Sequence, residues 1–163
     1  MNFVGSAGST RPITVKRIAN CGLPVPVSPS AWLMILQAYL PTPNDKWTVG
    51  WGHTGADVES TTLWTQEQAD AAFLADIAWV ERCVNKSVTA SINQNEFDAL
   101  CSLCFNIGCT AFGKSTLVKE LNLANFGAAA EQFSKWNKQA GKELAGLTRR
   151  RQAEAELFET EVT

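Results

Sequence analysis

The residues best placed to do chemistry lie in one short segment, WTVGWGHTG, which begins at Trp47. Bulky and small residues alternate from Trp47 to His53, which is the two-residue period of a β-strand. Gly50 and Gly52 would then leave one strand face open to an extended ligand, for which a polysaccharide is a reasonable guest. His53 could act as a general base at the strand end, but a lone histidine there is more often a hydrogen-bonded structural residue. We favour the structural role.

The tryptophans and the nearest acid of this segment have simpler interpretations. Trp47 and Trp51 lie on the strand face opposite the glycines, so we expect them to pack against helices rather than to stack on sugar rings. Asp45 precedes Thr48 by three residues and could supply a catalytic carboxylate, although an aspartate in a PTPND loop is equally typical of a turn. No Asp or Glu precedes Asp45 in the chain.

The whole chain has the composition of one folded domain. It has 163 residues, 45% of them hydrophobic and 18% charged, a balance that can bury a core. The net charge of −2 gives no general reason to expect nucleic acid or an anionic membrane as a partner. The longest apolar stretch, residues 31–40, is about half as long as the ~20 residues of a membrane-spanning helix. Residues 1–17 lack the apolar core of a signal peptide, so we expect synthesis to end in the cytoplasm.

The cysteines are interpreted as thiols. Five of them, at positions 21, 83, 101, 104 and 109, are an odd number in a chain without an export signal, which argues against a disulfide framework. Cys101, Cys104 and Cys109 could suggest a metal site. Because Cys101 and Cys104 lie among apolar residues at helical spacing, and the sole histidine is distant in sequence, buried thiols are the preferred interpretation. We therefore expect no metal and no cofactor.

Two capping boxes predict the main helices. Thr65 with Gln68 precedes an apolar helical pattern that is expected to end near Cys83. Asn93 with Glu96 repeats the signal before a second helix, which we expect to be the central one and which Gly108 can terminate. The apolar stripe of this second helix is Phe97, Leu100, Cys101, Cys104 and Phe105. Further helices are expected over residues 115–122, 126–136 and 148–159.

The arrangement of these elements predicts an α+β fold. Residues 5–30 mix Gly, Ser and Pro, so residues 1–30 are expected to form an irregular arm. Residues 31–40 could be a short helix or a strand. A lobe with β structure over about 38–60 would then meet a larger helical lobe over about 65–160, and such a junction commonly houses a ligand cleft.

Several motifs make the chain resemble the phage-type lysozymes of glycoside hydrolase family 24. In the family's order they are WTVGWGHTG, NQNEFDALCSLCFNIG, FGKSTLVKELN and KWNKQAGKELAGLTRRRQAEAELF, which together run from Trp47 to Phe158. AYLPTPND, from Ala38, is compatible with the same resemblance. It implies the fold of the T4-type lysozymes, a small N-terminal β lobe joined by a long central helix to a larger helical lobe. It also implies cleavage of bacterial peptidoglycan between N-acetylmuramic acid and N-acetylglucosamine.

The family's catalytic pattern is only partly present. It consists of a Glu, eight residues, an Asp or Cys, five residues and a Thr just before the GxGH turn, and Thr48 fits this Thr. The two other positions fall on Leu33 and Thr42, or, with a one-residue insertion, on Trp32 and Pro41, none of which is acidic. Glycoside cleavage needs a carboxylic acid for the leaving oxygen and a second carboxylate or its equivalent. Asp45 is the one nearby candidate for the second role.

The resemblance also indicates residues that contact the glycan. Asn106, Arg150 of the RRR run, and Trp136 with Asn137 correspond to segments that border the family's substrate groove. The alternatives are a helix cap for Asn106, a core position for Trp136, and a solvated helix face for at least one arginine, since Glu154 follows Arg150 by four residues.

Three functions follow from this reading of the chain. The first is an endolysin of phage or prophage origin, a monomer that leaves the host cytoplasm through a holin and acts on the periplasmic wall, without nucleic acid or stable membrane insertion. The second is a lysozyme fold that binds peptidoglycan without cutting it, because the family's Glu is missing. A helical interaction module that uses Arg11, Lys16 and Arg17 is a weaker third, with salt-sensitive partner binding as its expectation.

Overall fold

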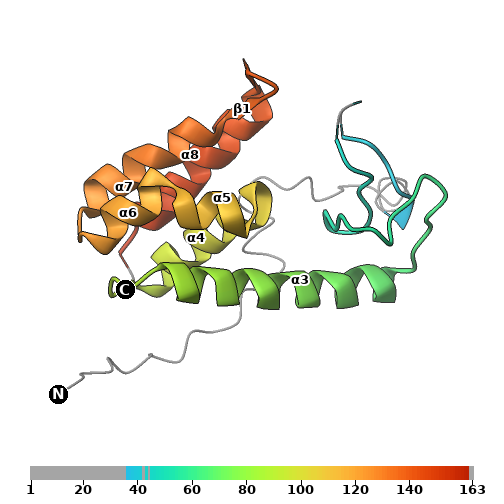
Figure 1. Ribbon diagram of the computed structural model, residues 1–163, viewed down its shortest axis with the longest axis horizontal. Helices are drawn as coiled ribbons and strands as arrows, with labels where there is room; N and C mark the ends of the chain where they lie inside the picture. Colours follow the sequence, from blue (N-terminus) through green and yellow to red (C-terminus); the bar gives the residue numbers. More distant parts are fainter. Residues whose placement is uncertain (1–35, 42, 44, 162–163) are drawn as a thin grey trace. The chain divides into compact units, whose positions relative to one another are not determined.

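The computed structural model describes residues 36–161 with the exception of residues 42 and 44 (Figure 1). The predicted arm of residues 1–30 therefore lies outside the described residues, as do residues 31–35 and position Thr42 of the catalytic pattern.

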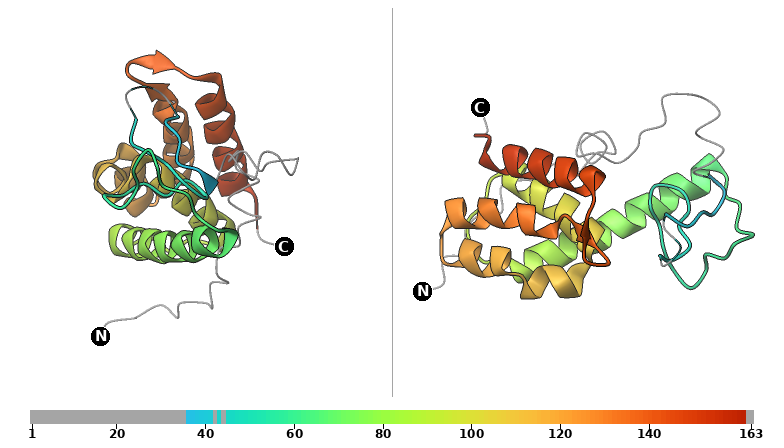
Figure 2. Two further views of the ribbon diagram at one scale, coloured as in Figure 1. Left: turned by 90° about the vertical axis from the view of Figure 1, so that its right-hand side faces the viewer. Right: turned by 90° about the horizontal axis from the view of Figure 1, so that it is seen from above.

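The described elements are mostly helical (Figures 1 and 2). The α-helices are α3 (Gln66–Ser87), α4 (Gln94–Ile107), α5 (Cys109–Lys114), α6 (Thr116–Asn122), α7 (Phe126–Gln132) and α8 (Ala145–Glu159), with a 3₁₀ helix, η1 (Phe133–Trp136), after α7. The strands β1 (Lys138–Gln139) and β2 (Lys142–Glu143) form an antiparallel pair with Lys138 opposite Glu143. The α+β class is confirmed, with the described sheet late in the chain.

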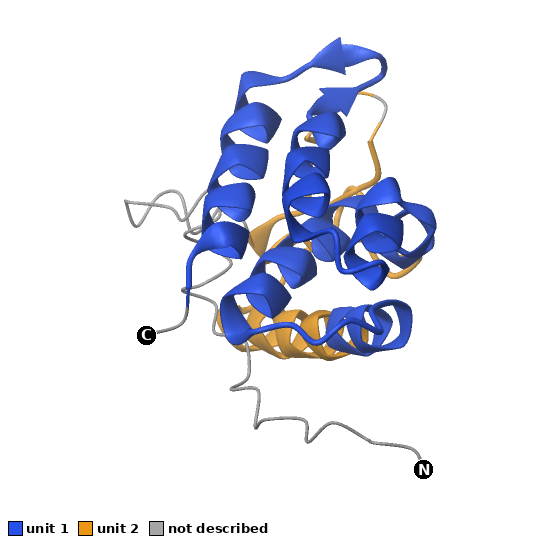
Figure 3. Ribbon diagram, turned by 90° about the vertical axis from the view of Figure 1, so that its left-hand side faces the viewer, with its two compact units in different colours: residues 1–24, 80–163 blue, residues 25–79 orange. Residues whose placement is uncertain are grey.

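The described residues form two compact units (Figure 3). Residues 36–79, here named the hairpin unit, include the WTVGWGHTG segment and the first part of α3. Residues 80–161, the helical unit, include the end of α3 and the helices that follow. One continuous helix thus contributes to both units.

The helical unit is built around α4. Its capping box is confirmed: the Glu96 amide donates to Asn93 Oδ1 at 2.9 Å, and the Asn93 amide donates to Glu96 Oε2 at 2.6 Å. Gly108, with φ of 85°, ends the helix as predicted. Between these ends every residue from 97 to 104 is buried, so α4 is covered by its neighbours along this length. Helices α6, α7 and α8 lie side by side in Figures 1 and 2.

The other predicted helices are also present, with shifted ends. The capping box of α3 forms, since the Thr65 amide donates to Gln68 Oε1 at 2.8 Å, but the helix continues to Ser87 rather than ending near Cys83. Helix α8 begins three residues before the predicted Thr148. The range 126–136 divides into α7 and η1.

The hairpin β1–β2 is an element that the sequence pattern did not predict. Its loop residues Ala140 and Gly141 have φ values of 48° and 78°. Positive φ at both loop positions is the geometry of a type I′ turn, for which Asn-Gly or Asp-Gly is the recognisable sequence. Here Ala140 occupies the first position, so the sequence does not show the usual pattern of this turn.

The hairpin unit carries isolated β-bridges instead of long strands. They join Gln37 to Leu63, Tyr39 to Thr48 and Val49 to His53. Ala38, Val49 and Val58 form a small buried cluster beside these bridges, and Trp47 and Trp64 pack against it. This cluster holds the WTVGWGHTG segment in place.

Candidate functional site

The WTVGWGHTG segment is a tight hairpin, and the prediction of one regular strand from Trp47 to His53 is wrong. The Val49 and His53 amides each donate to the other residue's carbonyl at 3.0 Å, so the chain reverses between them. Gly50 and Gly52 have φ values of 63° and 101°, in the region that glycine adopts without steric cost. The glycines are needed for the turn, and no strand face is left bare by them.

Gly50 also permits close packing against α3. A Cβ at this position would lie 3.0 Å from Ala69 Cβ and 3.3 Å from Trp64 Cε3. Such a contact is tighter than side chains tolerate without a shift. Gly50 is therefore a packing position, and contacts of Gly50 and Gly52 with glycan stay predictions.

His53 is held by two aspartates. Its Nδ1 lies 2.8 Å from Asp76 Oδ2 on α3, and its Nε2 lies 3.4 Å from Asp57 Oδ1. Burial lowers the pKa of His53, but the hydrogen bond and charge of Asp76, with a smaller contribution from Asp57, outweigh it and raise the pKa above its usual value. The predicted hydrogen-bonded role is confirmed. A protonated His53 would be a poor general base.

The tryptophans of the hairpin pack as expected. Trp51 lies edge-on to Phe73 of α3, with ring centroids 6.3 Å apart, and its Nε1 donates to Asp70 Oδ1 at 2.6 Å. Trp47 is half-buried against the cluster that contains Val49. Two side-chain contacts, from Trp51 and His53, thus fix this hairpin on α3.

Thr48 and Asp45 are the two predicted catalytic residues. Thr48 is buried, and its Oγ1 donates to the Lys46 carbonyl at 3.1 Å. Its backbone pairs with Tyr39 through two hydrogen bonds of 2.9 Å. Asp45 is half-buried in the loop before it. The Thr48 hydroxyl uses its proton within the loop and keeps its oxygen lone pairs as acceptors.

A buried ionic cluster lies between α4 and α8. Ser102 Oγ, Arg151 Nη2 and Arg150 Nε donate to one oxygen, Glu154 Oε1, at 2.6, 2.7 and 3.3 Å. Glu154 is fully buried, and the two arginines are 6% exposed or less. Burial raises the pKa of Glu154, while Arg151, Ser102 and Arg150 act against this rise. The alternative of a solvated helix face holds for Arg149, which is exposed, and not for Arg150 and Glu154, which are buried.

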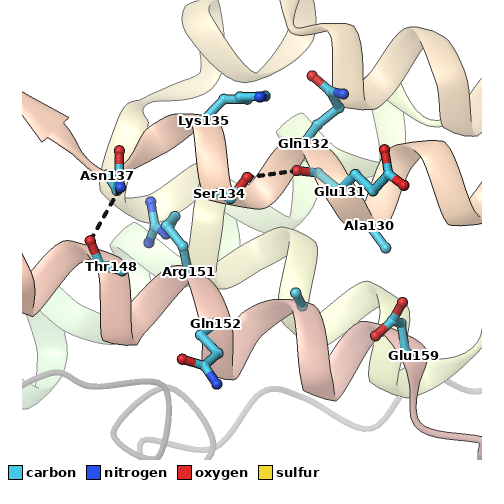
Figure 4. A pocket seen from close by; sticks show the side chains of 11 residues that line it. Ala130, Glu131, Gln132, Ser134, Lys135, Asn137, Thr148, Arg151, Gln152 and Glu159 are labelled. Atoms are coloured by element: carbon cyan, nitrogen blue, oxygen red, sulfur yellow. Dashed lines mark hydrogen bonds between the residues drawn. The ribbon is translucent and has the colours of Figure 1, made fainter. Parts of the chain in front are cut away.

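Arg151, rather than the predicted Arg150, connects this cluster to a polar pocket. Arg151 Nη1 donates to Asn106 Oδ1 at 3.0 Å, and Asn106 itself is exposed. Figure 4 shows Arg151 at the wall of a pocket of about 690 Å³ between α7, η1 and α8. Its lining includes Ser134, Lys135, Asn137, Thr148 and Gln152. Arg150 does not line it.

Two further predicted residues lie at or near this pocket. Asn137 lines it and donates through Nδ2 to Thr148 Oγ1 at 3.2 Å (Figure 4). Trp136, the last residue of η1, is half-buried, so it is not the fully buried core residue that we preferred. Contacts of Asn106, Asn137 and Arg150 with glycan stay predictions.

The cysteines differ in part from the expectation of thiols. Cys83 and Cys109 form a disulfide between α3 and α5, which contradicts that expectation for these two residues. Cys101 and Cys104 are free and buried, as predicted, and burial raises the pKa of the Cys104 thiol to about 12. The burial of Cys101 raises its pKa further.

Sequence reasoning missed several polar residues of the site. Ser102 lies inside an apolar stripe, and Asp70 and Asp76 lie on a helix where isolated carboxylates indicate a solvated face. Their spacing gave no signal either, because residues six apart on an α-helix lie about 120° apart around its axis. No helix among the described residues has the length and apolar character to cross a membrane.

Comparisons with known proteins agree with this geometry. The sequence model of the phage lysozyme family matches residues 34–154. The endolysin of Acyrthosiphon pisum secondary endosymbiont phage 1 is 46% identical over 119 residues, covering 71% of this chain and 81% of that protein. The endolysin of Bacillus phage PZA is 40% identical over 124 residues, 76% of this chain, although the chain spans only 48% of that protein's length.

A solved structure shares the fold as well. The muramidase domain of SpmX from Asticaccaulis excentricus has a TM-score of 0.72 and 32% sequence identity, covering 91% of this chain and 98% of that one. The predicted lysozyme-like fold is thereby confirmed. By the match of its sequence along most of its length and by its fold, the chain belongs to the phage lysozyme family.

Proposed function

We propose that the chain is a phage-type endolysin that hydrolyses the glycan strands of bacterial peptidoglycan between N-acetylmuramic acid and N-acetylglucosamine. The observation that carries this proposal is the WTVGWGHTG hairpin, fixed on α3 by Trp51 and His53 in a chain of the phage lysozyme family. The relatives at 46% and 40% identity are endolysins.

The proposed chemistry assigns Asp45 and Thr48 to the reacting end of the glycan. Glycoside hydrolysis passes through an oxocarbenium-like transition state that a carboxylate stabilises, or through a water that a carboxylate activates. Asp45 supplies this carboxylate, and Thr48, whose oxygen can still accept a hydrogen bond, positions the water. The leaving oxygen takes its proton from solvent water, because no Asp or Glu precedes Asp45. His53 is already engaged by Asp76 and serves to hold the hairpin.

The absence of the family's general-acid Glu from the catalytic pattern favours a second function. No Asp or Glu occurs in residues 1–44, so the family's general acid has no counterpart at its position. General acid–base catalysis is worth roughly 10²- to 10⁴-fold in rate, so a chain without that group would retain binding and lose most turnover. Binding of peptidoglycan without cleavage is the alternative function.

One experiment separates the two functions. The purified chain is incubated with isolated peptidoglycan, and the released muropeptides are identified by mass spectrometry, with Asp45→Ala, Thr48→Ala and, as a matched control in the same unit, Glu59→Gln. Hydrolysis predicts disaccharide fragments that disappear in Asp45→Ala and persist in Glu59→Gln. Co-sedimentation without release, by a chain whose circular dichroism shows it to be folded, would establish the binding function.

The pocket of the helical unit provides a second contact in this proposal. Lys135, Arg151 and Asn137 offer donors to carbonyl and carboxylate groups of peptidoglycan. Lys135 is exposed, so Lys135→Ala should weaken co-sedimentation without unfolding the chain. If the wild type and Lys135→Ala co-sediment with peptidoglycan to the same extent, the pocket does not bind it and the proposal of a second contact is wrong.

The finer cellular setting is also proposed. The chain acts as a monomer on the periplasmic wall and reaches it through a holin. Expression in a host with and without a holin, followed by the turbidity of the culture, tests the route, since lysis without a holin would contradict it.

A further inference from the structure

Three sulfur atoms meet in the helical unit, and the proposed hydrolysis does not use them. Cys83 lies on α3, Cys104 on α4 and Cys109 at the start of α5. Their Sγ atoms all lie within 4.8 Å of one another, and those of Cys104 and Cys109 are 3.8 Å apart. Cys101, one turn before Cys104 on α4, is outside the group.

The 3.8 Å between the sulfur atoms of Cys104 and Cys109 matches the spacing of a metal–thiolate site. Metal–sulfur bonds of about 2.3 Å in a tetrahedral site place two sulfur atoms roughly 3.8 Å apart. Three different helices supply the three cysteines, so the backbone positions are fixed by helix packing before any ion binds. Cys104 is buried, whereas Cys83 and Cys109 are half-buried and leave the group accessible from one side.

The redox state decides whether these sulfurs are available. In the oxidised chain Cys83 and Cys109 are bonded to each other. A dithiol reductant gives two electrons and two protons to this disulfide and becomes a disulfide itself, which leaves three thiols side by side. The disulfide and an ion exclude each other because both need the sulfurs of Cys83 and Cys109.

We propose that the reduced chain binds one thiophilic d¹⁰ cation, Zn²⁺ or Cu⁺, through the sulfur atoms of Cys83, Cys104 and Cys109. Thiolate ligands select these ions. Among the described residues no histidine or carboxylate joins the group, so Zn²⁺ takes a water molecule as its fourth ligand and Cu⁺ takes the three sulfurs alone. In the reduced chain the bound ion links α3 to α5, as the disulfide does in the oxidised chain, and it also links both helices to α4.

The test titrates the full chain after reduction by a phosphine under anaerobic conditions. Zn²⁺ is added in competition with a chromogenic chelator, and Cu⁺ in a separate titration with a Cu⁺-selective chelator. We expect one equivalent of at least one ion to bind, Cys104→Ala to weaken this binding by about tenfold or more, and the oxidised chain not to bind. Whichever ion binds more tightly identifies the preferred occupant.

Cys101→Ala is the matched control, because it removes a buried thiol from the same helix outside the group. It should bind as the wild type does. Failure of the reduced wild type to bind either ion, or equal losses in Cys101→Ala and Cys104→Ala, overturns the proposal.

Two further readouts guard the test against a folding defect. Cd²⁺ should give a sulfur-to-metal charge-transfer band in the reduced wild type and not in Cys104→Ala. If circular dichroism shows that variant to be unfolded, Cys83→Ser takes its place with the same expected loss. If the folded variant, Cys104→Ala or Cys83→Ser, gives a charge-transfer band as strong as that of the wild type, the proposed site is wrong. This outcome does not depend on whether the chain cleaves peptidoglycan.

Discussion

The hairpin unit and the helical unit hold their polar side chains in opposite ways. In the hairpin unit, His53 and Trp51 are half-buried. Trp51 contacts the exposed Asp70 of α3, and His53 contacts the half-buried Asp76. In the helical unit, Arg150, Arg151 and Glu154 are buried together. Charge interactions are weak where water screens them and strong where it is excluded, and an unpaired buried charge is very costly. We therefore expect the polar contacts of the hairpin unit to contribute little to the free energy of unfolding, and those between α4 and α8 to contribute much more.

The largest effect is expected from the apolar core of the helical unit. Phe97 is 4% exposed on α4, so Phe97→Ala should lower the free energy of unfolding by about 3 to 5 kcal/mol, measured by urea denaturation. Phe105, on the same stripe, is half-buried and should cost less. A loss below about 1 kcal/mol for Phe97 would contradict the role of α4 as the core helix.

The ionic cluster should give the next largest effect. Glu154→Gln keeps the shape of the side chain but removes the negative charge of the carboxylate to which Arg151 and Arg150 donate. We therefore expect a loss of about 1.5 to 3 kcal/mol in the free energy of unfolding. Glu156→Gln is the control, since Glu156 is exposed on the same helix. If the two variants lose the same stability, burial does not make the Glu154 carboxylate more important for folding than an exposed carboxylate of the same helix.

A glycine in each unit tests whether the hairpin is held by packing. Gly50 and Gly141 both have positive φ, but a Cβ on Gly50 meets Ala69 whereas one on Gly141 meets nothing. Gly50→Ala should therefore cost about 1 to 3 kcal/mol, and Gly141→Ala about 1 kcal/mol. Thermal unfolding measures both, and a cost for Gly141→Ala equal to or above that of Gly50→Ala would exclude close packing at Gly50.

The smallest effect is a pH dependence in the hairpin unit. The pKa of His53 is raised in the folded chain above the unfolded value of about 6.5, so its stabilisation is complete below that value and is lost as the pH rises through the folded pKa. As the pH rises above about 6.5, the wild type should lose stability, and Asp76→Asn should lose less. Asp57→Asn, which removes the 3.4 Å contact, should change the pH dependence less than Asp76→Asn does. Parallel curves for the wild type and Asp76→Asn would contradict this account.

Much of the helical unit could be predicted from the sequence because its signals are local. The boxes at Asn93 and Thr65 place the starts of α4 and α3, and Gly108 places the end of α4, since capping depends on residues within one turn. Helix α5 was missed because six residues are too few for a helical period.

The candidate site was harder to predict because its contacts join residues distant in sequence. His53 pairs with Asp76, and Ser102 with Glu154, at separations of 23 and 52 residues, which no local pattern encodes. The same holds for the Cys83–Cys109 disulfide, 26 residues apart. The glycine pattern was visible but ambiguous, because alternation with glycine at every second position is shared by an open strand and by a turn. Only the φ values of Gly50 and Gly52 separate the two.

The hydrogen bond from Ser102 of α4 to Glu154 Oε1 of α8 fixes the register between these two helices. Apolar side chains would allow two helices to slide past each other and repack, since contact between methyl groups has little directionality. A slip of one turn moves α8 by about 5.4 Å, which carries Glu154 beyond the reach of Ser102 and leaves a buried carboxylate short of a donor. Glu154 therefore selects one docking of the last helix among several that the apolar surface alone would permit.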